Sequence, residues 1–358
     1  MNKKIKIAVG MSGGVDSSVA AALLKEKGYE VVGLFMDIFD GSLDIRPNGR
    51  HTCYGYDKKD DIASAENVCR HLDIPLAVID MKREFREDVI GYFRDEYLAG
   101  RTPNPCVVCN HRIKFGALLE KAGNMGIGFD FFATGHYARI VEDEGRLLLM
   151  RPVDLAKDQT YFLYRLTGKQ LQRIMFPLGE YTKKDVRDIA GSLGLRTTHL
   201  PESQDFISGS DYSPLFTEGE IIPGDIVDER GAVLGRHKGI IHYTVGQRKG
   251  LGVVASRPLY VRKIDTVNNR ITVGYKETLF SKELIASGIN LIGSDRLEFP
   301  CRAKVKIRIQ HQAADADIYP YEDDKVKVIF DEPQLAITPG QSAVFYQGDI
   351  VLGGGVIS

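Results

Sequence analysis

A turn near the start of the chain combines three glycines with an acid: Gly10, Gly13, Gly14 and Asp16. Glycines leave backbone N–H groups open to an anion, and a helix start adds about half a positive charge, so we expect this turn to bind phosphate. The turn lacks the lysine of the common phosphate loop, G-x-x-x-x-G-K-S/T, which disfavours the kinase and GTPase classes. A carboxylate beside bound phosphates suits a magnesium-bridging role, because Mg²⁺ prefers carboxylate and phosphate oxygens.

A second motif with chemical potential is the cysteine pair Cys106 and Cys109, which follows the rigid approach formed by Pro103 and Pro105. Both thiols are predicted to lie just before a helix that runs from Ile113 to about Ala122. A helix start and neighbouring cations lower a thiol pKa and favour the nucleophilic thiolate. The cations concerned are Arg101, Arg112 and Lys114. A single C-x-x-C lacks the second pair typical of structural zinc, so it predicts reactive thiols or cluster ligands.

Three further candidates lie toward the ends of predicted strands. Met36 lies near the end of an apolar run, where doubly wound sheets bind ligands. Gly135 and His136 come at the end of another such run, and a glycine there allows a nucleotide to approach closely. Taken alone, His136 is more typical of a hydrogen-bonded structural histidine than of a functional one.

The composition is that of an ordinary soluble protein with room for two or three domains. The 358 residues are 43% hydrophobic and 27% charged, with a net charge of -1. This balance gives no global basic field, so a nucleic-acid partner would need segregated lysines and arginines. No apolar stretch approaches the roughly 20 residues of a membrane span, and we expect a cytoplasmic protein. Five cysteines without a signal peptide argue against a disulfide framework.

Strands and helices alternate over the first part of the chain, which predicts an α/β domain over residues 1–209 with a parallel sheet. Apolar runs predict strands at 5–9, 31–39, 75–81 and 129–138, and the segment 40–57 is predicted to be a loop. Helical spacing predicts helices at 17–24, 60–72 and 84–97, with Cys69 in the core. Thr182 and Asp185 predict the start of another helix.

The pattern changes at about residue 210 to glycine, proline and short β-branched runs. We expect a small mixed domain over 210–280, with a hairpin formed by 259–265 and 270–273, and a β-barrel over 281–358. Within the barrel, apolar and basic residues alternate over 303–310. This alternation predicts a strand with one basic, exposed face.

Several motifs together carry a resemblance to a known family. The loop Ser12–Ser17 resembles that of the N-type ATP pyrophosphatases, which break ATP between the α- and β-phosphates. The whole chain is similar to the tRNA-specific 2-thiouridylase (MnmA) family, which replaces O2 of the wobble uridine with sulfur. The motifs are GMSGGVDSS, GLFM, GRTPNPC-x-x-CN-x-x-IKFG, ATGHYAR, KDQTYFL, ESQD, YTVGQRKGLG, FDEP and TPGQ-x-AVFY-x-GD-x-VLGGG.

The resemblance implies an adenine-nucleotide α-hydrolase-like sheet domain and a role for each matching residue. Cys109 would be the nucleophile, with Cys106 and Asp16 the other catalytic residues. ATP would be bound by Gly10, Met11, Ser12, Gly13, Gly14, Val15, Asp16, Ser17, Met36 and Gly135. The target base would meet Asn104, Pro105 and Cys106, and the rest of the tRNA would meet His136, Lys157, Asp158, Gln159, Arg308, Ile309 and Gln341. Cofactors would be ATP and Mg²⁺, and partners tRNA and a protein that donates persulfide or sulfide.

One position departs from the family. The family usually has a second, persulfide-bearing cysteine after its E-S-Q motif, where this chain has Ile207 followed by Ser208. Two hypotheses remain open. Either Cys106 and Cys109 form the sulfur relay themselves, or they ligate an iron–sulfur cluster with Cys53 as a third ligand.

Other functions also stay open on the sequence alone. The loop would suit an ATP pyrophosphatase acting on a small molecule, although the barrel and the cysteine pair would then have no evident task. The missing second cysteine would suit an RNA-binding paralogue without sulfur transfer. No motif identifies the sulfur donor or fixes the oligomeric state, for which a monomer is favoured.

Overall fold

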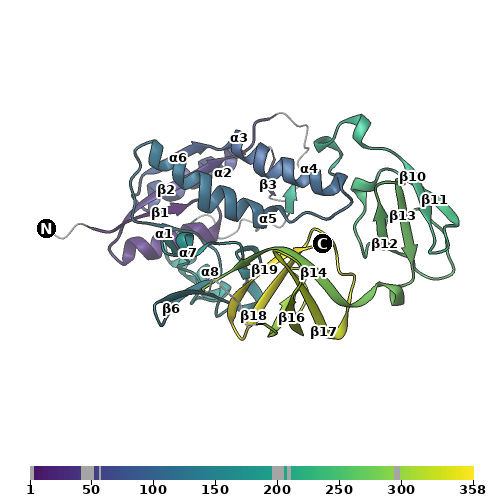
Figure 1. The fold of residues 1–358 in the computed structure, drawn as a ribbon. Coiled ribbons are helices and arrows are strands. Elements are labelled where there is room, and N and C mark those ends of the chain that lie inside the picture. The colour runs from purple at the N-terminus through teal and green to yellow at the C-terminus, as the bar shows by residue number, and fades with distance from the viewer. Residues whose placement is uncertain (1–3, 42–51, 56–57, 196–204, 208–210, 294–298) are drawn as a thin grey trace.

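A computed structural model describes residues 4–41, 52–55, 58–195, 205–207, 211–293 and 299–358. In Figure 1 the N-terminal sheet and its helices lie beside a barrel drawn in green and yellow, and a smaller sheet lies at the far end from the N-terminus. The architecture is therefore the predicted one: an α/β domain, a small mixed domain and a β-barrel.

The first domain is built on a five-stranded parallel sheet in the order β4-β2-β1-β5-β8. Ile7 and Val9 of β1 pack on one face of the sheet and Ala8 packs on the other. Both faces are thus covered, as parallel sheets require. The strands are β1 (Lys6–Gly10), β2 (Glu30–Asp37), β4 (Leu76–Asp80), β5 (Phe131–Ala133) and β8 (Ile174–Met175).

The predicted helices cover the two faces of this sheet. One face packs against α1 (Val15–Glu26), α2 (Lys58–His71) and α8 (Lys183–Ser192). The other packs against residues 82–98, which form α3 (Lys82–Phe85), η1 (Arg86–Ile90) and α4 (Gly91–Leu98), and against residues 105–124, which form α5 (Pro105–Val108), η2 (Cys109–Ala117) and α6 (Leu118–Asn124). The predicted cap is confirmed, since Thr182 and Asp185 form a capping box at α8, and Cys69 is buried as expected.

Two predictions about local structure in this domain were wrong. The cysteine helix begins at Pro105, not at Ile113, because proline fits the first position of a helix and needs no N–H partner there. The segment predicted as a loop at 40–57 contains β3 (Thr52–Tyr54), which pairs in parallel with β9 (Asp205–Ile207) and sets Tyr54 opposite Ile207. Ile207 is 2% exposed and belongs to the core.

The C-terminal barrel has six antiparallel strands and closes where β14 pairs with β19. Its strands are β14 (Phe280–Leu291), β15 (Cys301–Lys306), β16 (Ala314–Pro320), β17 (Lys325–Leu335), β18 (Ser342–Gln347) and β19 (Ile350–Ile357). The hairpin of β6 (Arg139–Asp143) and β7 (Arg146–Met150) from the first domain joins the same sheet, because β7 pairs with β19. One continuous sheet therefore links the two domains.

The middle domain is a four-stranded mixed sheet in the order β11-β10-β13-β12. The predicted hairpin is confirmed by the antiparallel pairing of β12 with β13, while β10 runs parallel to β13. The strands are β10 (Gly224–Val227), β11 (Val233–His237), β12 (Tyr260–Asp265) and β13 (Arg270–Gly274). Short helices complete the described chain: α7 (Gly168–Leu171), η3 (Leu155–Lys157), η4 (Thr160–Phe162), η6 (Ser213–Leu215), η7 (Glu218–Glu220), η8 (Ile240–His242) and η9 (Lys276–Leu279).

The prediction of a strand with one basic, exposed face in the barrel was confirmed only in part. Strand β15 ends at Lys306. Ala303, Val305 and Ile307 are buried as expected, whereas Lys304 is exposed and Lys306 and Arg308 are half-buried. Lys304 pairs with Asp315 at 3.0 Å, and burial lowers the pKa of Lys306. The guanidinium of Arg308 donates to the carbonyl oxygens of Leu335 and Ala336. Most of this positive charge is therefore taken up by the protein itself.

Candidate functional site

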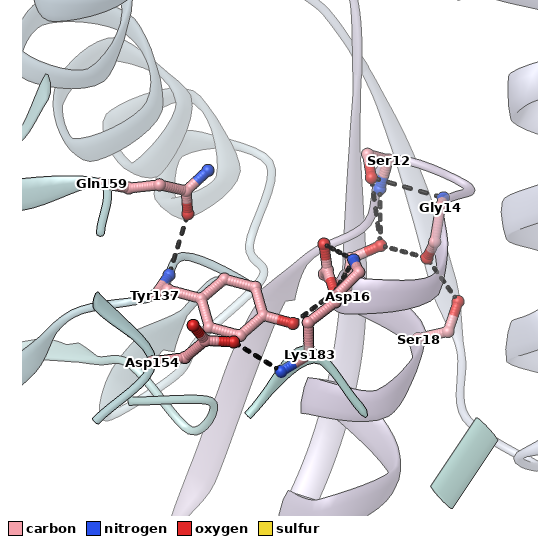
Figure 2. Close-up of polar contacts among 9 residues, drawn as sticks. Ser12, Gly14, Asp16, Ser18, Tyr137, Asp154, Gln159 and Lys183 are labelled. Atoms are coloured by element: carbon pink, nitrogen blue, oxygen red, sulfur yellow. Dashed lines mark hydrogen bonds and ion pairs between the residues drawn. The ribbon is translucent and has the colours of Figure 1, made fainter. Parts of the chain in front are cut away.

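The glycine turn lies between β1 and α1 and is held by serine hydroxyls. The hydroxyl of Ser12 lies 3.1 Å from that of Ser17, and the hydroxyl of Ser18 donates to the carbonyl of Gly14 at 2.8 Å. Gly13 has a φ of +80°, and a Cβ there would lie 2.8 Å from the carbonyl oxygen of Asp61. A left-handed conformation and a close backbone neighbour both require glycine at this position. Figure 2 shows the polar contacts of Ser12, Gly14 and Ser18 around the start of α1.

Gly135 lies directly against this turn. A Cβ on Gly135 would be 2.7 Å from the carbonyl carbon of Asp16 and 2.7 Å from the amide nitrogen of Ser17. The end of β5 thus supports the first turn of α1, as expected for two neighbouring strands of a parallel sheet whose loops meet at one edge. Met36, at the end of β2, is partly buried against the core.

Asp16 is held by two side chains from distant parts of the chain. The ammonium of Lys183, in the first turn of α8, lies 2.7 and 2.8 Å from the two carboxylate oxygens. The hydroxyl of Tyr137 donates to one of them at 2.9 Å. Figure 2 shows the three side chains meeting beside the glycine turn.

The two candidate cysteines lie in the first turns of a continuous helix. Asn104 precedes it, Pro105 is its first residue, and Cys106 and Cys109 are three residues apart. Side chains at this spacing share one helix face, with about 5–6 Å between Cβ atoms. Both thiols are partly buried.

The cations expected to surround the thiols are partly committed elsewhere. Arg101 pairs with Glu96, and Arg112 lies 3.0 Å from Asp88. Lys114 contributes to lowering the pKa of His136. The helix start is a part of the predicted activation that the geometry supplies directly.

A loop of the barrel fastens the segment that leads into the cysteine helix. The side-chain amide of Gln341 donates to the carbonyls of Thr102 and Pro103 at 3.1 and 3.0 Å. The amide of Thr102 donates in turn to the carbonyl of Pro339 at 2.8 Å. Gln341 was expected to touch RNA. That role stays a prediction. In the structure, the Gln341 side chain binds the segment that precedes the cysteine helix.

Replacing Gly340 by alanine is expected to displace this segment. Gly340 has a φ of +87°, and a Cβ would lie 2.7 Å from the carbonyl oxygen of Thr102. We expect the activity that the cysteine pair supports to fall by about tenfold or more, because a misplacement of a reacting group by about 1 Å can lower a rate by about a hundredfold. The measurement is the rate of product formation by the folded variant.

Gly348→Ala is the matched control. Gly348 has a φ of +57° and no neighbour within 4 Å of an added Cβ. Alanine there is therefore strained by the left-handed backbone but does not clash with a neighbouring atom. Equal activities of the two variants would contradict a positioning role for the loop.

His136 is packed and hydrogen-bonded. Its Nδ1 lies 2.7 Å from the hydroxyl of Thr134, and its ring lies 6.0 Å from those of Phe115 and Phe176. Burial, and the charge of Lys114 to a smaller extent, hold the pKa of His136 well below its ordinary value of 6.5. The imidazole is therefore neutral near pH 7.

This lowered pKa predicts a pH dependence of stability. The unfolded chain protonates His136 near pH 6.5 and the folded protein does not, so the contribution is complete above pH 6.5 and is lost as pH falls below it. As pH falls below 6.5, the free energy of unfolding of the wild type should decrease faster than that of His136→Asn. The difference between the two slopes should be up to about 1.4 kcal/mol per pH unit. Urea unfolding between pH 5 and 8 measures the slopes. His71→Asn, at an exposed histidine, serves as the control, and equal slopes for His136→Asn and wild type would contradict the assignment.

The polar segment after the β6–β7 hairpin supports the same turn. The side chain of Gln159 accepts from the amide of Tyr137 at 2.8 Å. The side chain of Asp158 is 6% exposed, accepts from Thr160 at 2.9 Å and faces Arg151 at 3.4 Å. Lys157 is partly buried, and Ile309 is 37% exposed. Contact of these residues with tRNA stays a prediction.

A resident metal centre gains no support from the described part of the chain. Among the described residues, no three histidine, cysteine or acidic side chains gather closely enough to hold an ion. Cys53 lies in β3, and its side chain is outside the described residues.

No helix in the described part of the chain is long and apolar enough to cross a membrane.

Sequence reasoning missed Lys183, Tyr137 and the true partners of Gln341. The capping residues Thr182 and Asp185 were recognised. Lys183, at the first position of that helix, was the signal in the sequence that could have pointed to an ionic partner. Its partner is 167 residues away, so only the packing of α8 on α1 reveals the pair.

Comparison with known proteins gives three matches to family models along the chain. Residues 5–208 match the tRNA methyl transferase HUP domain, 217–275 the tRNA methyl transferase PRC-barrel domain, and 281–357 the aminomethyltransferase beta-barrel domain.

Relatives match over the whole length. The chain is 50% identical to the tRNA-specific 2-thiouridylase MnmA of Acetivibrio thermocellus, covering 100% of both chains. It is 49% identical to MnmA 1 of Thermoanaerobacter pseudethanolicus and 47% identical to MnmA of Clostridium perfringens, each over 100% of this chain and 99% of the relative. With the HUP sheet, the mixed middle sheet and the closed barrel all in place, the chain belongs to the tRNA-specific 2-thiouridylase family.

Proposed function

We propose that this protein uses ATP to replace O2 of the wobble uridine of a tRNA with sulfur. The observation that carries the proposal is the turn after β5, which contacts both the nucleotide turn and the helix that carries the cysteines. Gly135 packs against Asp16 and Ser17 of the nucleotide turn, and the ring of His136 lies beside Phe115 in the cysteine helix. The nucleotide turn and the helix that carries the cysteines therefore pack against one short segment, and Phe115 lies six residues after Cys109 in that helix.

The proposed reaction has two steps. In the first, uridine O2 attacks the α-phosphorus of ATP, a new O–P bond forms, and the bond to the β-phosphate breaks to release pyrophosphate. In the second, sulfur attacks C2 and the C2–O bond breaks to release AMP. Adenylation turns a poor leaving group into a good one, and the glycine turn with the start of α1 is suited to hold the phosphates.

Magnesium enters this proposal together with ATP. The Asp16 carboxylate already accepts bonds from Lys183 and Tyr137, so it does not form a ready-made site for a resident ion. Mg²⁺ in such sites is held by one or two carboxylates and by the substrate's phosphates. The arrangement fits an ion that arrives on the nucleotide.

For sulfur transfer we propose a relay between Cys106 and Cys109. A persulfide on one cysteine attacks C2 through its terminal sulfur and displaces AMP. The thiolate of the other cysteine then attacks the first cysteine's sulfur, which forms a disulfide and releases 2-thiouridine. A thiol reductant must afterwards return the disulfide to two thiols, and a persulfide-donating protein must reload the site. The spacing of about 5–6 Å between Cβ atoms exceeds the usual disulfide value of about 4 Å, so the first turn must tighten slightly.

The iron–sulfur alternative is separated from the relay by an iron assay. A cluster needs more ligands than the two thiols that the described residues bring together. Protein purified without oxygen is expected to contain iron only at background level. Stoichiometric iron that is lost with Cys53→Ala would contradict the relay.

The proposed function is tested by nucleoside mass spectrometry. tRNA is taken from a thiouridylase-deficient bacterium that expresses this chain, and restored 2-thiouridine is the expected result. If none appears, the assay is repeated in vitro with ATP and sulfide. Binding of tRNA without thiolation from any donor would instead favour an RNA-binding paralogue, and pyrophosphate release that ignores tRNA would favour a small-molecule substrate.

A further inference from the structure

The glycine turn lacks a lysine of its own, and the fold supplies one. Lys183 comes from the first turn of α8, which packs on α1. Its ammonium contacts both carboxylate oxygens of Asp16, in the first turn of α1. The Lys183 side chain is 8% exposed and that of Asp16 is 27% exposed. A nearly buried ammonium therefore contacts a carboxylate that belongs to the proposed phosphate-binding turn.

The position of Lys183 is fixed from several directions. Its backbone N–H donates to the carboxylate of Asp154 at 2.9 Å, and the capping box of Thr182 holds the same turn. The Tyr137 ring centroid lies 5.8 Å from the ammonium, and the Tyr137 hydroxyl binds the shared carboxylate. These contacts keep the ammonium on the side of α8 that faces the glycine turn, and Figure 2 shows Lys183 with Asp154, Asp16 and Tyr137.

Stability alone explains this pair poorly. Removing two charges from water costs about as much as their attraction returns, so a buried ion pair is weak evidence for a stabilising role. The neighbouring Lys184 shows the ordinary case, since its side chain is 82% exposed and pairs with Asp188 on the same helix. A buried cation beside an anion-binding turn is better explained by a ligand.

The charge of the ligand supplies the reason. The phosphates of ATP and the leaving pyrophosphate carry several negative charges, whereas residues 10–18 contain no lysine or arginine. Backbone N–H groups and a helix start supply only partial charges. We propose that Lys183 is the phosphate-binding lysine of this site, with its ammonium on the β- and γ-phosphates of ATP and with Asp16 as its positioning residue.

This inference rests on the proposed use of ATP and is tested by equilibrium binding, which needs neither tRNA nor sulfur. Isothermal titration calorimetry compares ATP, pyrophosphate and AMP on wild type, Lys183→Met, Lys183→Arg and the matched control Lys184→Met. Lys183→Met should weaken ATP and pyrophosphate about 10- to 100-fold, the effect of one charge-assisted hydrogen bond. AMP, which lacks the two outer phosphates, should change by less than about threefold. Lys183→Arg should retain part of the affinity, and Lys184→Met should match wild type.

The results also separate this inference from the function on which it rests. Unchanged pyrophosphate affinity in Lys183→Met, or an equal loss for AMP, overturns the inference. If wild type binds ATP but produces no 2-thiouridine, the proposed function fails while the role of Lys183 is still measured. A wild type that binds neither ATP nor pyrophosphate overturns both.

A second pair of variants covers the possibility that Lys183→Met does not fold. Lys183→Met leaves the Asp16 carboxylate without its cation, which can destabilise the fold. Asp16→Asn combined with Lys183→Met removes both charges and avoids this unpaired carboxylate. The double variant is compared with Asp16→Asn alone. Pyrophosphate binding at least tenfold weaker in the double variant supports the inference, and equal binding overturns it.

Discussion

Replacing Cys109 by alanine is expected to abolish formation of 2-thiouridine, with a loss of at least about a thousandfold. The thiol lies in the first turns of the helix that begins at Pro105, on the face it shares with Cys106. The thiol of Cys106 cannot replace it, because the proposed relay needs both cysteines. Adenylation does not use the thiol, so tRNA-dependent pyrophosphate release should persist in the variant. Nucleoside mass spectrometry and a pyrophosphate assay on the same protein measure the two steps.

The chain offers a matched control for this experiment. Cys301→Ala removes a partly buried thiol in the barrel, whose pKa burial raises, and thiolation should then stay close to wild type. Cys106→Ala should also stop the relay, because the released product requires the second thiolate. Thiolation by Cys109→Ala above about one per cent of wild type would contradict the assignment of the nucleophile.

Replacing Gly135 by alanine is expected to weaken ATP binding by about a hundredfold. The added Cβ would lie 2.7 Å from two backbone atoms, the carbonyl carbon of Asp16 and the amide nitrogen of Ser17. Backbone cannot rotate away as a flexible side chain can, so the first turn of α1 must move. Overpacking of this kind costs about 1–3 kcal/mol of stability, which should leave the protein folded. The measurement is the dissociation constant of ATP.

Gly123→Ala is the control for this substitution. Gly123 lies in α6, and an added Cβ there meets nothing within 4 Å, so ATP binding should be unchanged and the helix slightly more stable. If Gly135→Ala bound ATP with an affinity within threefold of wild type, this result would contradict the proposal that the packing of Gly135 on α1 is needed for ATP binding.

The sequence predicted the elements whose signal is local. The β–α alternation, the glycine turn, the Thr182 cap and the barrel strands all depend on neighbours within a few residues, and each was found close to its predicted place. The start of the cysteine helix was missed because prolines were interpreted as holding an extended segment, whereas Pro105 occupies the first helical position.

Contacts between distant segments could not be predicted in the same way. Alternating lysines and arginines indicated an exposed face, but Arg308 donates to carbonyls of another loop and Lys306 is partly buried. The pairing of Lys183 with Asp16 and the contact of Gln341 with Thr102 join residues more than 160 positions apart. Such contacts depend on how domains pack, which no local pattern records.

The sheet shared by β7 and β19 sets an order of events during synthesis. Met150 pairs with Ile350, 200 residues later. At about 5–20 residues per second, the ribosome needs roughly 10–40 s to deliver that partner. Until β19 emerges, the β6–β7 hairpin and strands β14 and β18 all present unpaired edges, which are sites of aggregation. The nascent α/β domain is therefore expected to depend on chaperones until the barrel is complete, and a transcript cut short before residue 350 should yield insoluble protein.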